Sequence, residues 1–356
     1  MEAPSRELFD LLAEYGHEQV VFSHEPSCGY RGIIAIHDTT LGPALGGTRF
    51  WRYASDREAL IDVLRLSRGM TYKAATAGLN LGGGKSVIIG DNRTRDREFI
   101  MRAHGRAVNS LGGRYITAED VGTSVEDMDY VHMETESVVG IVGRSGDPSP
   151  VTAYGVYRGI KACAQRRFGS DDLKDRAVAV QGVGHVGFNL CRYLAKEGTK
   201  LFVSDIDEAR ATRAAEELKA EVVDAEGIYS VEADVFAPCA LGAVINQRTV
   251  PLLKVSIVAG AANNQLEREA DDDLLEEREI LYAPDYVINA GGLINVYSEL
   301  AGWSLERSKR KAGEIYHTLL QIFDLAAAEG MTSADAADRL AEQRLERVAR
   351  LHRSRT

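Results

Sequence analysis

Residues 177 to 187 read AVAVQGVGHVG, an apolar strand-like run that leads directly into a glycine-rich turn. A helical stretch follows the turn, with Val186, Leu190 and Leu194 on one apolar stripe. Glycines in such a turn let a phosphate group approach the backbone closely, and the helix N-terminus favours negative charge. This order of strand, turn and helix predicts a dinucleotide-binding α/β unit.

The strand expected next supports a particular dinucleotide. Leu201 to Ser204 ends in Asp205, 23 residues after Gly182. An acidic residue at about this distance accepts hydrogen bonds from a ribose 2′-hydroxyl and repels a 2′-phosphate, which favours NAD over NADP. The candidate cofactor contacts in the turn are therefore Gly182, Gly184, His185, Val186 and Gly187. We interpret His185 as a solvent-facing spacer and not as a catalyst.

The pattern around this unit predicts an α/β protein of two domains. Further apolar strands are expected at 235–237, 256–259, 280–283 and 286–289, and their alternation with helices indicates a doubly wound parallel sheet. The first 140 residues also alternate strand-like and helical runs. We predict a substrate-binding and catalytic domain at 1–145, a Rossmann-type NAD-binding domain at 146–329, and C-terminal helices, of which 330–356 joins the first domain.

Composition excludes several classes of function. The 356-residue chain carries a net charge of −11, which disfavours nucleic-acid and anionic-membrane partners. It has no apolar run long enough to span a membrane, and its first 15 residues contain acidic side chains unlike a signal peptide, so we expect a cytoplasmic protein. The four cysteines are widely spaced without a C-x-x-C pair, so no metal site is predicted.

The stretch GGGKS at 82–86 looks like the end of a phosphate-binding P-loop, but its register is wrong. That motif requires glycine six positions before Lys85, where this chain has Leu79. The order of elements is also reversed, because a helix-like stretch precedes the glycines and a β-branched run follows them. We therefore expect a glycine turn, a strand from Lys85 to Ile89, and another role for the lysine.

Two lysines and an aspartate are candidates for catalysis. Ser55-x-x-Glu58 is a capping box that starts a helix, and Lys73 continues its apolar stripe. Lys85 follows twelve residues later, and two ammonium groups at one apolar pocket disfavour each other's charged form. One could hold an anion while the other acts as a neutral base. Asp120 directly follows the expected strand 114–117, where loops gather ligands.

These stretches together resemble the amino-acid dehydrogenase family, and within it most closely the leucine enzymes. The resemblance runs from about residue 16 to 347 and includes the blocks IIAIHDTTLGPALGGTRFW, RGMTYKAATAGLNLGGGKSVIIG, GRYITAEDVGTSVEDMD, APCALGAVIN, VAGAANNQL and LYAPDYVINAGGLINV. It implies NAD-dependent oxidative deamination of an L-amino acid to a 2-oxo acid and ammonia. It further implies that Lys73 binds the substrate carboxylate, Lys85 activates water and Asp120 shuttles protons.

The resemblance also implies contacts beyond these three residues. Thr152 and the pair Asn263 and Asn264 correspond to contacts at the nicotinamide end, and Pro238, Cys239 and Ala240 to the loop beneath the adenosine. The implied substrate pocket consists of Leu45, Gly46, Met70, Ala118, Val139, Leu293 and Val296. Leu45 stands where glutamate-specific relatives carry a lysine, so a second substrate carboxylate would be buried unpaired at a cost of several kcal/mol.

Other readings stay open at this point. Val139 and Leu293 depart from the usual leucine-enzyme pattern, and a phenylalanine- or valine-preferring enzyme of the same family is the alternative. A non-catalytic NAD(H)-sensing protein is a more remote one, opposed by the two lysines and Asp120 and by the absence of a basic recognition helix. The family forms homo-oligomers, and the apolar strands 20–22 and 32–36 are candidates for pairing between subunits.

Overall fold

The computed structural model describes residues 7–141 and 147–353. The chain forms two compact units, Met1–Gly146 with Ala341–Thr356, and Asp147–Leu340. The two-domain α/β class predicted from the sequence is confirmed. The predicted boundary at 145 and 146 lies outside the described residues. The C-terminal helix α13 (Ser333–Arg353) belongs to the first unit only from Ala341 onward, later than the predicted residue 330.

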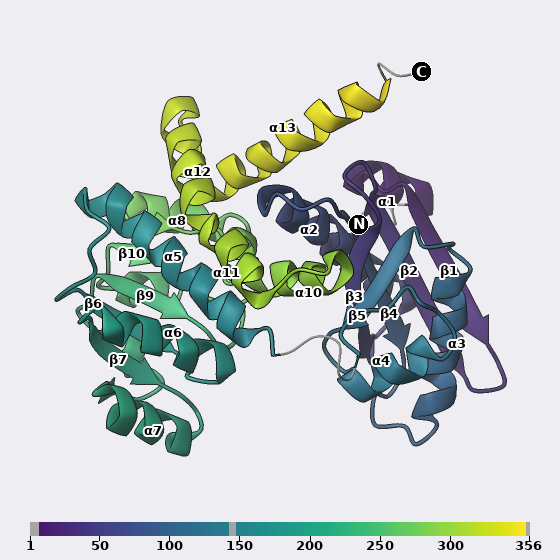
Figure 1. Ribbon diagram of the computed structural model, residues 1–356, viewed down its shortest axis with the longest axis horizontal. Helices are drawn as coiled ribbons and strands as arrows, with labels where there is room; N and C mark the ends of the chain where they lie inside the picture. The colour runs from purple at the N-terminus through teal and green to yellow at the C-terminus, as the bar shows by residue number, and fades with distance from the viewer. Residues whose placement is uncertain (1–6, 142–146, 354–356) are drawn as a thin grey trace, which may run out of the picture. The chain divides into compact units, whose positions relative to one another are not determined.

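The first unit contains a mixed five-stranded sheet with the order β1-β2-β4-β3-β5 (Figure 1). β1 and β2 form an antiparallel hairpin, β2 pairs antiparallel with β4, and β3 lies parallel to both β4 and β5. The strands are β1 (Gln19–Glu25), β2 (Tyr30–Asp38), β3 (Ala44–Trp51), β4 (Gly82–Ile89) and β5 (Tyr115–Glu119). Both long edges of β2 are occupied, so the prediction that 32–36 pairs between subunits is wrong, whereas β1 is an edge strand of this sheet.

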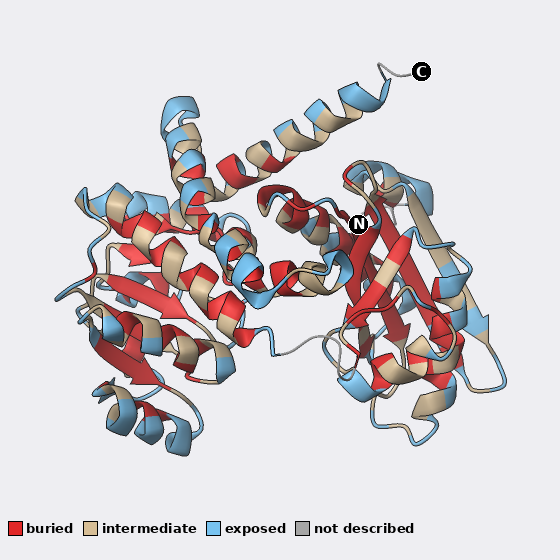
Figure 2. Ribbon diagram, in the orientation of Figure 1, coloured by how far each residue is buried: buried red, intermediate tan, exposed pale blue. Residues whose placement is uncertain are grey.

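Helices cover both faces of this sheet. Alternate residues of each strand point to opposite faces, so Ile33 and Val87 pack beneath α2 while Ile34 and Ile88 face the other side. Figure 2 shows β2, β3 and β4 almost continuously buried, as two covered faces require, whereas β1 at the edge is half-buried or exposed. The helices are α1 (Leu8–Tyr15) and α2 (Asp56–Thr76) on one face, and α3 (Arg97–Asn109) and α4 (Val125–His132) on the other.

Close packing explains the three glycines of β4. A Cβ at Gly83 would lie 2.2 Å from the backbone nitrogen of Thr71 in α2, and one at Gly84 would lie 2.6 Å from the Tyr115 ring. The predicted glycine turn is therefore wrong: β4 begins at Gly82, and the glycines are strand residues that let α2 and the neighbouring strands approach. The turn itself lies earlier, at Gly78, whose φ is +68°.

The second unit contains an all-parallel six-stranded sheet with the order β11-β10-β9-β6-β7-β8 (Figure 1). Its central strands carry few charged side chains because both faces are buried. The strands are β6 (Ala177–Gln181), β7 (Lys200–Ser204), β8 (Glu221–Val222), β9 (Val235–Pro238), β10 (Ile257–Val258) and β11 (Leu281–Tyr282).

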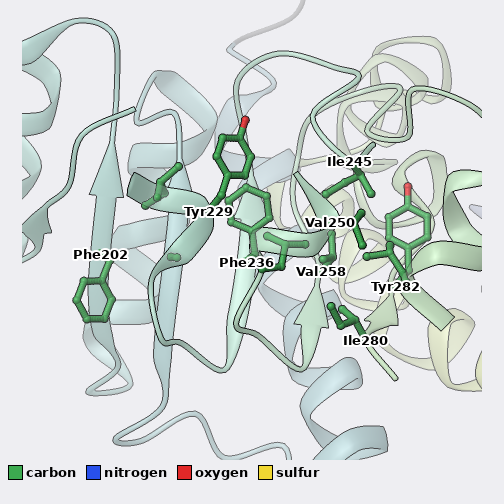
Figure 3. Packing of buried hydrophobic residues seen from close by; sticks show 12 residues of the cluster. Phe202, Tyr229, Phe236, Ile245, Val250, Val258, Ile280 and Tyr282 are labelled. Atoms are coloured by element: carbon green, nitrogen blue, oxygen red, sulfur yellow. The ribbon is translucent and has the colours of Figure 1, made fainter. Parts of the chain in front are cut away.

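One row of the parallel register forms the core on one face of this sheet. Ala179 pairs with Phe202 and with Phe236, Phe236 pairs with Val258, and Val258 pairs with Tyr282. Figure 3 shows the labelled members of this row among Tyr229, Ile245, Val250 and Ile280. The segments that cover this face include η1 (Gly227–Ser230), η2 (Val250–Leu252) and α8 (Asp271–Glu277).

Helices complete the second unit, and α5 packs against five of them, α6, α9, α10, α11 and α12. These helices are α5 (Ser149–Phe168), α6 (His185–Lys196), α7 (Glu208–Leu218), α9 (Asp285–Ile288), α10 (Gly291–Ala301), α11 (Leu305–Gly313) and α12 (Ile315–Glu329). The predicted strand 286–289 is wrong. Pro284 ends the extended chain, and its carbonyl accepts the amide protons of Val287 and Ile288, which starts a short helix. Among the described residues, no helix is long and apolar enough to cross a membrane.

Candidate active site

The parallel register of β3, β4 and β5 gathers the candidate catalytic residues. Thr48 of β3 pairs with Ser86 of β4 and with Glu119 of β5. Lys85 precedes Ser86 in β4, and Asp120 follows Glu119 directly after β5, so the two residues flank β3 on either side. Gly83 and Lys85 share a face of β4, and α2 covers that face at Gly83. Lys85 and Asp120 therefore lie together on the α2 side of the sheet.

A chain of ion pairs begins at Lys85. Its Nζ lies 3.0 Å from Oδ2 of Asp120, and the Lys85 side chain is only 8% exposed. Nε of Arg49 also contacts Asp120 Oδ2, at 3.2 Å, while Nη1 of Arg49 donates to Asp62 Oδ2 at 2.9 Å. Tyr53 donates its hydroxyl proton to the same Asp62 oxygen at 2.6 Å. Two cations and two carboxylates thus alternate from β4 to α2.

The charges around Asp120 decide its ionisation. Burial by itself would raise the pKa of this carboxyl group, but the ammonium of Lys85 and the guanidinium of Arg49 outweigh burial and hold the pKa below its usual range. The neighbouring Glu119 has the opposite shift, because burial and the charge of Asp120 raise its pKa. The first unit therefore holds Asp120 as a carboxylate, able to accept a proton.

The loop that carries Asp120 is fixed to β3. The Asp120 backbone amide donates to Oγ1 of Thr123, and that hydroxyl can in turn donate to the carbonyl of Thr48. Gly122 has φ +83°, and a Cβ there would lie 2.0 Å from the carbonyl oxygen of Phe50, so this position requires glycine. These contacts fix where the Asp120 carboxylate can lie.

A buried polar network supports the same strands on the opposite face of the sheet. The hydroxyl of Thr48 is within hydrogen-bond distance of Ser86 Oγ (2.7 Å), His104 Nε2 (2.8 Å) and Thr117 Oγ1 (2.6 Å). The other ring nitrogen of His104 pairs with the Tyr30 hydroxyl at 3.0 Å. Burial lowers the pKa of His104 to about 3, so the ring is neutral and donates one hydrogen bond while accepting another.

The structure arranges the predicted substrate residues of the first unit on adjoining elements. Leu45 of β3 is buried and pairs with Ile116 of β5, and Ala118 pairs with Gly47 in the same register. The Met70 side chain of α2 lies 3.3 Å from the Cβ position of Gly46. Val139 is buried, and its amide donates to the carbonyl of Thr117 next to Ala118. The assignment of these residues to one pocket stays a prediction.

Lys73 lies in the last turn of α2 and is half-buried. The predicted cap of this helix is present, since Ser55 accepts the amide proton of Glu58, while the Glu58 carboxylate takes the amide of Ala54. The apolar stripe predicted along α2 is only partly buried, since Val63 is buried whereas Met70 and Lys73 are half-buried. Leu293, which is buried, and Val296, which is half-buried, lie on α10 in the second unit.

The glycine turn of the second unit fits a dinucleotide. Gly182 has φ +92°, and a Cβ at Gly187 would lie 1.9 Å from the carbonyl oxygen of Gly182, so both positions require glycine. Gly184 is the N-cap of α6, and a Cβ there would meet only the end of a flexible arginine. The turn thus leaves open space at the N-terminus of a twelve-residue helix, where a pyrophosphate is favoured.

Asp205 lies where the ribose contact was predicted, at the end of β7. Its Oδ2 accepts the amide proton of Val183 and its Oδ1 that of Asp207, so the carboxylate joins the turn to the next strand. Each oxygen keeps a further lone pair for a hydroxyl group. His185 is exposed at the start of α6, which is the location expected of a spacer, and Val186 is half-buried.

The remaining cofactor candidates lie on loops of the second unit. The Cys239 amide donates to the carbonyl of Gln181 at the end of β6, and Ala240 lies against Gly182. Pro238 ends β9. Asn263 and Asn264 are both exposed, and Asn264 has φ +51°. Thr152 is buried in α5, where its hydroxyl donates to the carbonyl of Pro148 and its backbone adjoins Gly291 of α10.

Sequence reasoning missed Arg49, Asp62, Tyr53 and Asn289. Arg49 is two steps of two along β3 from Leu45 and so shares its face, but this strand was not predicted from the sequence. Asp62 and Tyr53 carry no such signal, since their contacts depend on how α2 returns across the sheet. Asn289 donates from Nδ2 to the side chain of Asn263, a contact across 26 residues that no spacing rule predicts.

Comparison with known proteins agrees with this geometry. The family model described as "Glu/Leu/Phe/Val dehydrogenase, dimerisation domain" matches residues 17–137, and the model "Glutamate/Leucine/Phenylalanine/Valine dehydrogenase" matches residues 203–355. The chain is 57% identical to a leucine dehydrogenase of Thermoactinomyces intermedius over 95% of this chain and 93% of that protein. It is 56% identical to a leucine dehydrogenase of Geobacillus stearothermophilus over 96% of this chain and 94% of that protein.

A solved structure supports the fold as well. The crystal structure of L-tryptophan dehydrogenase from Nostoc punctiforme superposes with a TM-score of 0.89 and 48% identity, covering 96% of this chain and all of that chain. These relatives match both units, and the resemblance seen in the sequence is confirmed. The chain belongs to the glutamate, leucine, phenylalanine and valine dehydrogenase family.

Proposed function

We propose that this chain catalyses the NAD-dependent oxidative deamination of an apolar L-amino acid, with leucine and other branched-chain amino acids preferred. The products are the 2-oxo acid, ammonia and NADH. The observation that carries this proposal is the ion pair between Lys85, within β4, and Asp120, directly after β5, in a chain more than half identical to leucine dehydrogenases.

The first unit supplies the groups that hold the amino acid and move its protons. Lys73 binds the α-carboxylate, for which an ammonium at the half-buried end of α2 is suited. Asp120 accepts a proton from the substrate amine, because neighbouring cations keep it ionised. Once Asp120 has released that proton to solvent, its carboxylate can take a proton from the Lys85 ammonium, which lies 3.0 Å away. The neutral amine of Lys85 then takes a proton from the water that attacks the imine.

The second unit supplies the cofactor contacts. NAD, when bound, accepts the hydride that leaves the substrate α-carbon. Gly182, Gly184 and Gly187 leave room for the pyrophosphate, and Asp205 accepts hydrogen bonds from a ribose. Thr152, Asn263 and Asn264 are proposed at the nicotinamide end, with Pro238, Cys239 and Ala240 beneath the adenosine.

Side-chain selectivity follows from the apolar residues. Leu45 is 2% exposed, so a glutamate side chain there would bury a second carboxylate with no partner. The same surroundings accept leucine, valine and isoleucine. Leu293 and the 48% identity to a tryptophan dehydrogenase favour an aromatic substrate as the second candidate, and the difference between such substrates is only about 1–3 kcal/mol.

The direct test is to measure NADH formation by the purified protein with NAD and each of the twenty L-amino acids. We expect the highest kcat/KM with a branched-chain amino acid, a lower value with phenylalanine, and none measurable with glutamate. NADH formation with phenylalanine above leucine would establish the second candidate instead. Failure with every amino acid would contradict the proposal.

A homo-oligomer is also proposed. The family model for residues 17–137 is described as a dimerisation domain, and β1 is an edge strand within that range. Phe22 on this strand is 53% exposed, which suits a contact with a second copy. The expected location in the cytoplasm stays a prediction.

A further inference from the structure

Arg49 occupies a position between two carboxylates that the mechanism above leaves unexplained. Its Nε contacts Asp120 at 3.2 Å, and its Nη1 contacts both oxygens of Asp62, at 3.2 and 2.9 Å. The Arg49 side chain is 21% exposed and that of Asp62 28%, so solvent screens this contact less than it would an open surface pair. Arg49 therefore touches the proposed proton acceptor with one edge and is anchored to α2 by the other.

Asp62 is itself held by a hydrogen bond from Tyr53. The Tyr53 hydroxyl donates to Asp62 Oδ2. Burial is the main cause that raises the pKa of Tyr53, and the hydrogen bond to Asp62 is the second, so the tyrosine keeps its proton. A guanidinium is a planar, permanently charged group whose rigid fork of N–H donors fixes the direction of its contacts to two carboxylates, whereas a lysine ammonium is a point charge on a flexible stem. This arrangement fixes both the charge and the direction of the Arg49 side chain.

We propose that Arg49 is a positioning residue that holds the Asp120 carboxylate oriented and ionised, and that Asp62 moderates its charge. Together they set the pH range in which Asp120 accepts the substrate's proton. The inference rests on the proposed function for the role of Asp120, but the ion-pair chain itself is observed. Among the described residues of the first unit, the charged and titratable groups that act on Asp120 or on Arg49 include Lys85 from β4, Asp62 and Tyr53 from the α2 side, and Tyr115 and Glu119 from β5, which ends next to Asp120.

The proposal predicts shifts of opposite sign for two neighbouring substitutions. Arg49→Gln removes a cation that favours ionised Asp120, so the acid limb of kcat/KM against pH should move upward by about one pH unit. Asp62→Asn removes a carboxylate that partly neutralises Arg49, so the acid limb should move downward. Arg49→Lys keeps the charge and loses the double contact, so its acid limb should stay near that of the wild type while kcat falls.

Matched controls come from an exposed ion pair close by. Arg52 directly follows β3 and pairs with Asp91, with side chains 75% and 43% exposed. Arg52→Gln and Asp91→Asn make the same charge changes without touching Asp120, and should leave the profile unchanged. If Arg49→Gln and Asp62→Asn moved the acid limb in the same direction, or no further than these controls, the proposal would be refuted.

A second measurement does not depend on activity. The thermal midpoint of the Asp120→Asn variant is compared with that of its parent across pH, once with Arg49 present and once in an Arg49→Gln background. A carboxylate with a lowered folded pKa stabilises the protein above its ordinary pKa and loses this contribution as pH falls. The loss should be smaller, and complete at a higher pH, in the Arg49→Gln background, because the folded pKa of Asp120 then lies closer to its unfolded value.

The two measurements separate the two proposals. If the wild type forms no NADH with any amino acid, the proposed function fails, and the thermal comparison alone decides whether Arg49 controls Asp120. If the wild type is active and the loss of stability has the same size and ends at the same pH in both backgrounds, the inference about Arg49 fails while the function stands.

Discussion

Replacing Thr48 by valine tests whether the buried network beneath the sheet supports the site on its other face. Valine has nearly the same shape, but it removes hydrogen bonds of 2.7, 2.8 and 2.6 Å to Ser86, His104 and Thr117. Each such bond contributes about 0.5–1.5 kcal/mol. Ser86 keeps longer contacts to His104 and to the Tyr115 hydroxyl, at 3.3 and 3.1 Å, so part of the loss is offset.

We therefore expect Thr48→Val to lower the free energy of unfolding by about 2–3 kcal/mol. Thr48→Ser is the control, because it keeps the hydroxyl and loses one methyl group, at a cost of about 1 kcal/mol. Urea unfolding at one fixed protein concentration measures both, since oligomers unfold in a concentration-dependent way. Looser strands should also misplace Lys85 and Asp120 and reduce kcat by roughly tenfold. A Thr48→Val variant no less stable than Thr48→Ser would refute this reasoning.

Three further predictions concern single sites. Lys73→Ala should mainly raise KM for the amino acid, whereas Lys85→Ala should mainly lower kcat, by about 100-fold or more; steady-state kinetics in which Lys85→Ala kept its kcat would exclude it as the base. Asp205→Ser combined with Ile206→Arg, at a position 93% exposed, should shift the ratio of kcat/KM from NAD toward NADP, and an unchanged ratio would remove Asp205 from the ribose contact. Burial holds the pKa of His104 near 3, against 6.5 ordinarily, so below pH 6.5 the unfolded chain binds a proton that the folded chain refuses. As pH is lowered from 6.5, this residue should decrease the free energy of unfolding by about 1.4 kcal/mol per pH unit. His104→Gln should reduce that slope in urea titrations at several pH values.

Local patterns predicted the elements whose causes are local. The strand, glycine turn and helix at 177–196 are where the sequence indicates, because turn conformation and strand-helix packing depend on residues close in the chain. Ser55 starts α2 for the same reason. Lys85 and Asp120 were named from separate local patterns, and their contact of 3.0 Å follows from a register with β3 that was not predicted.

Elements determined by distant contacts could not be predicted in this way. β3 has two adjacent glycines, Gly46 and Gly47, which are unfavourable in strands and hid it from pattern reasoning. A Cβ at Gly46 would lie 1.7 Å from the carbonyl of Gly84, so a close approach between strands requires glycine there. Asp62 contacts Arg49 because α2 crosses the sheet at one particular angle, which the sequence pattern does not contain.

The balance of charge in this ion-pair chain bears on how the reaction begins. Lys85 and Arg49 contribute two positive charges, and Asp120 and Asp62 contribute two negative ones, so the chain of side chains is neutral before substrate binds. An amino acid brings its own carboxylate, which the proposal assigns to Lys73, and an ammonium that would be a third cation around Asp120. At low exposure such an excess charge is disfavoured, and release of one proton to solvent, directly or by way of Asp120, removes it. The same arrangement that keeps Asp120 ionised therefore promotes the loss of the substrate's proton, which must precede departure of the hydride from the α-carbon.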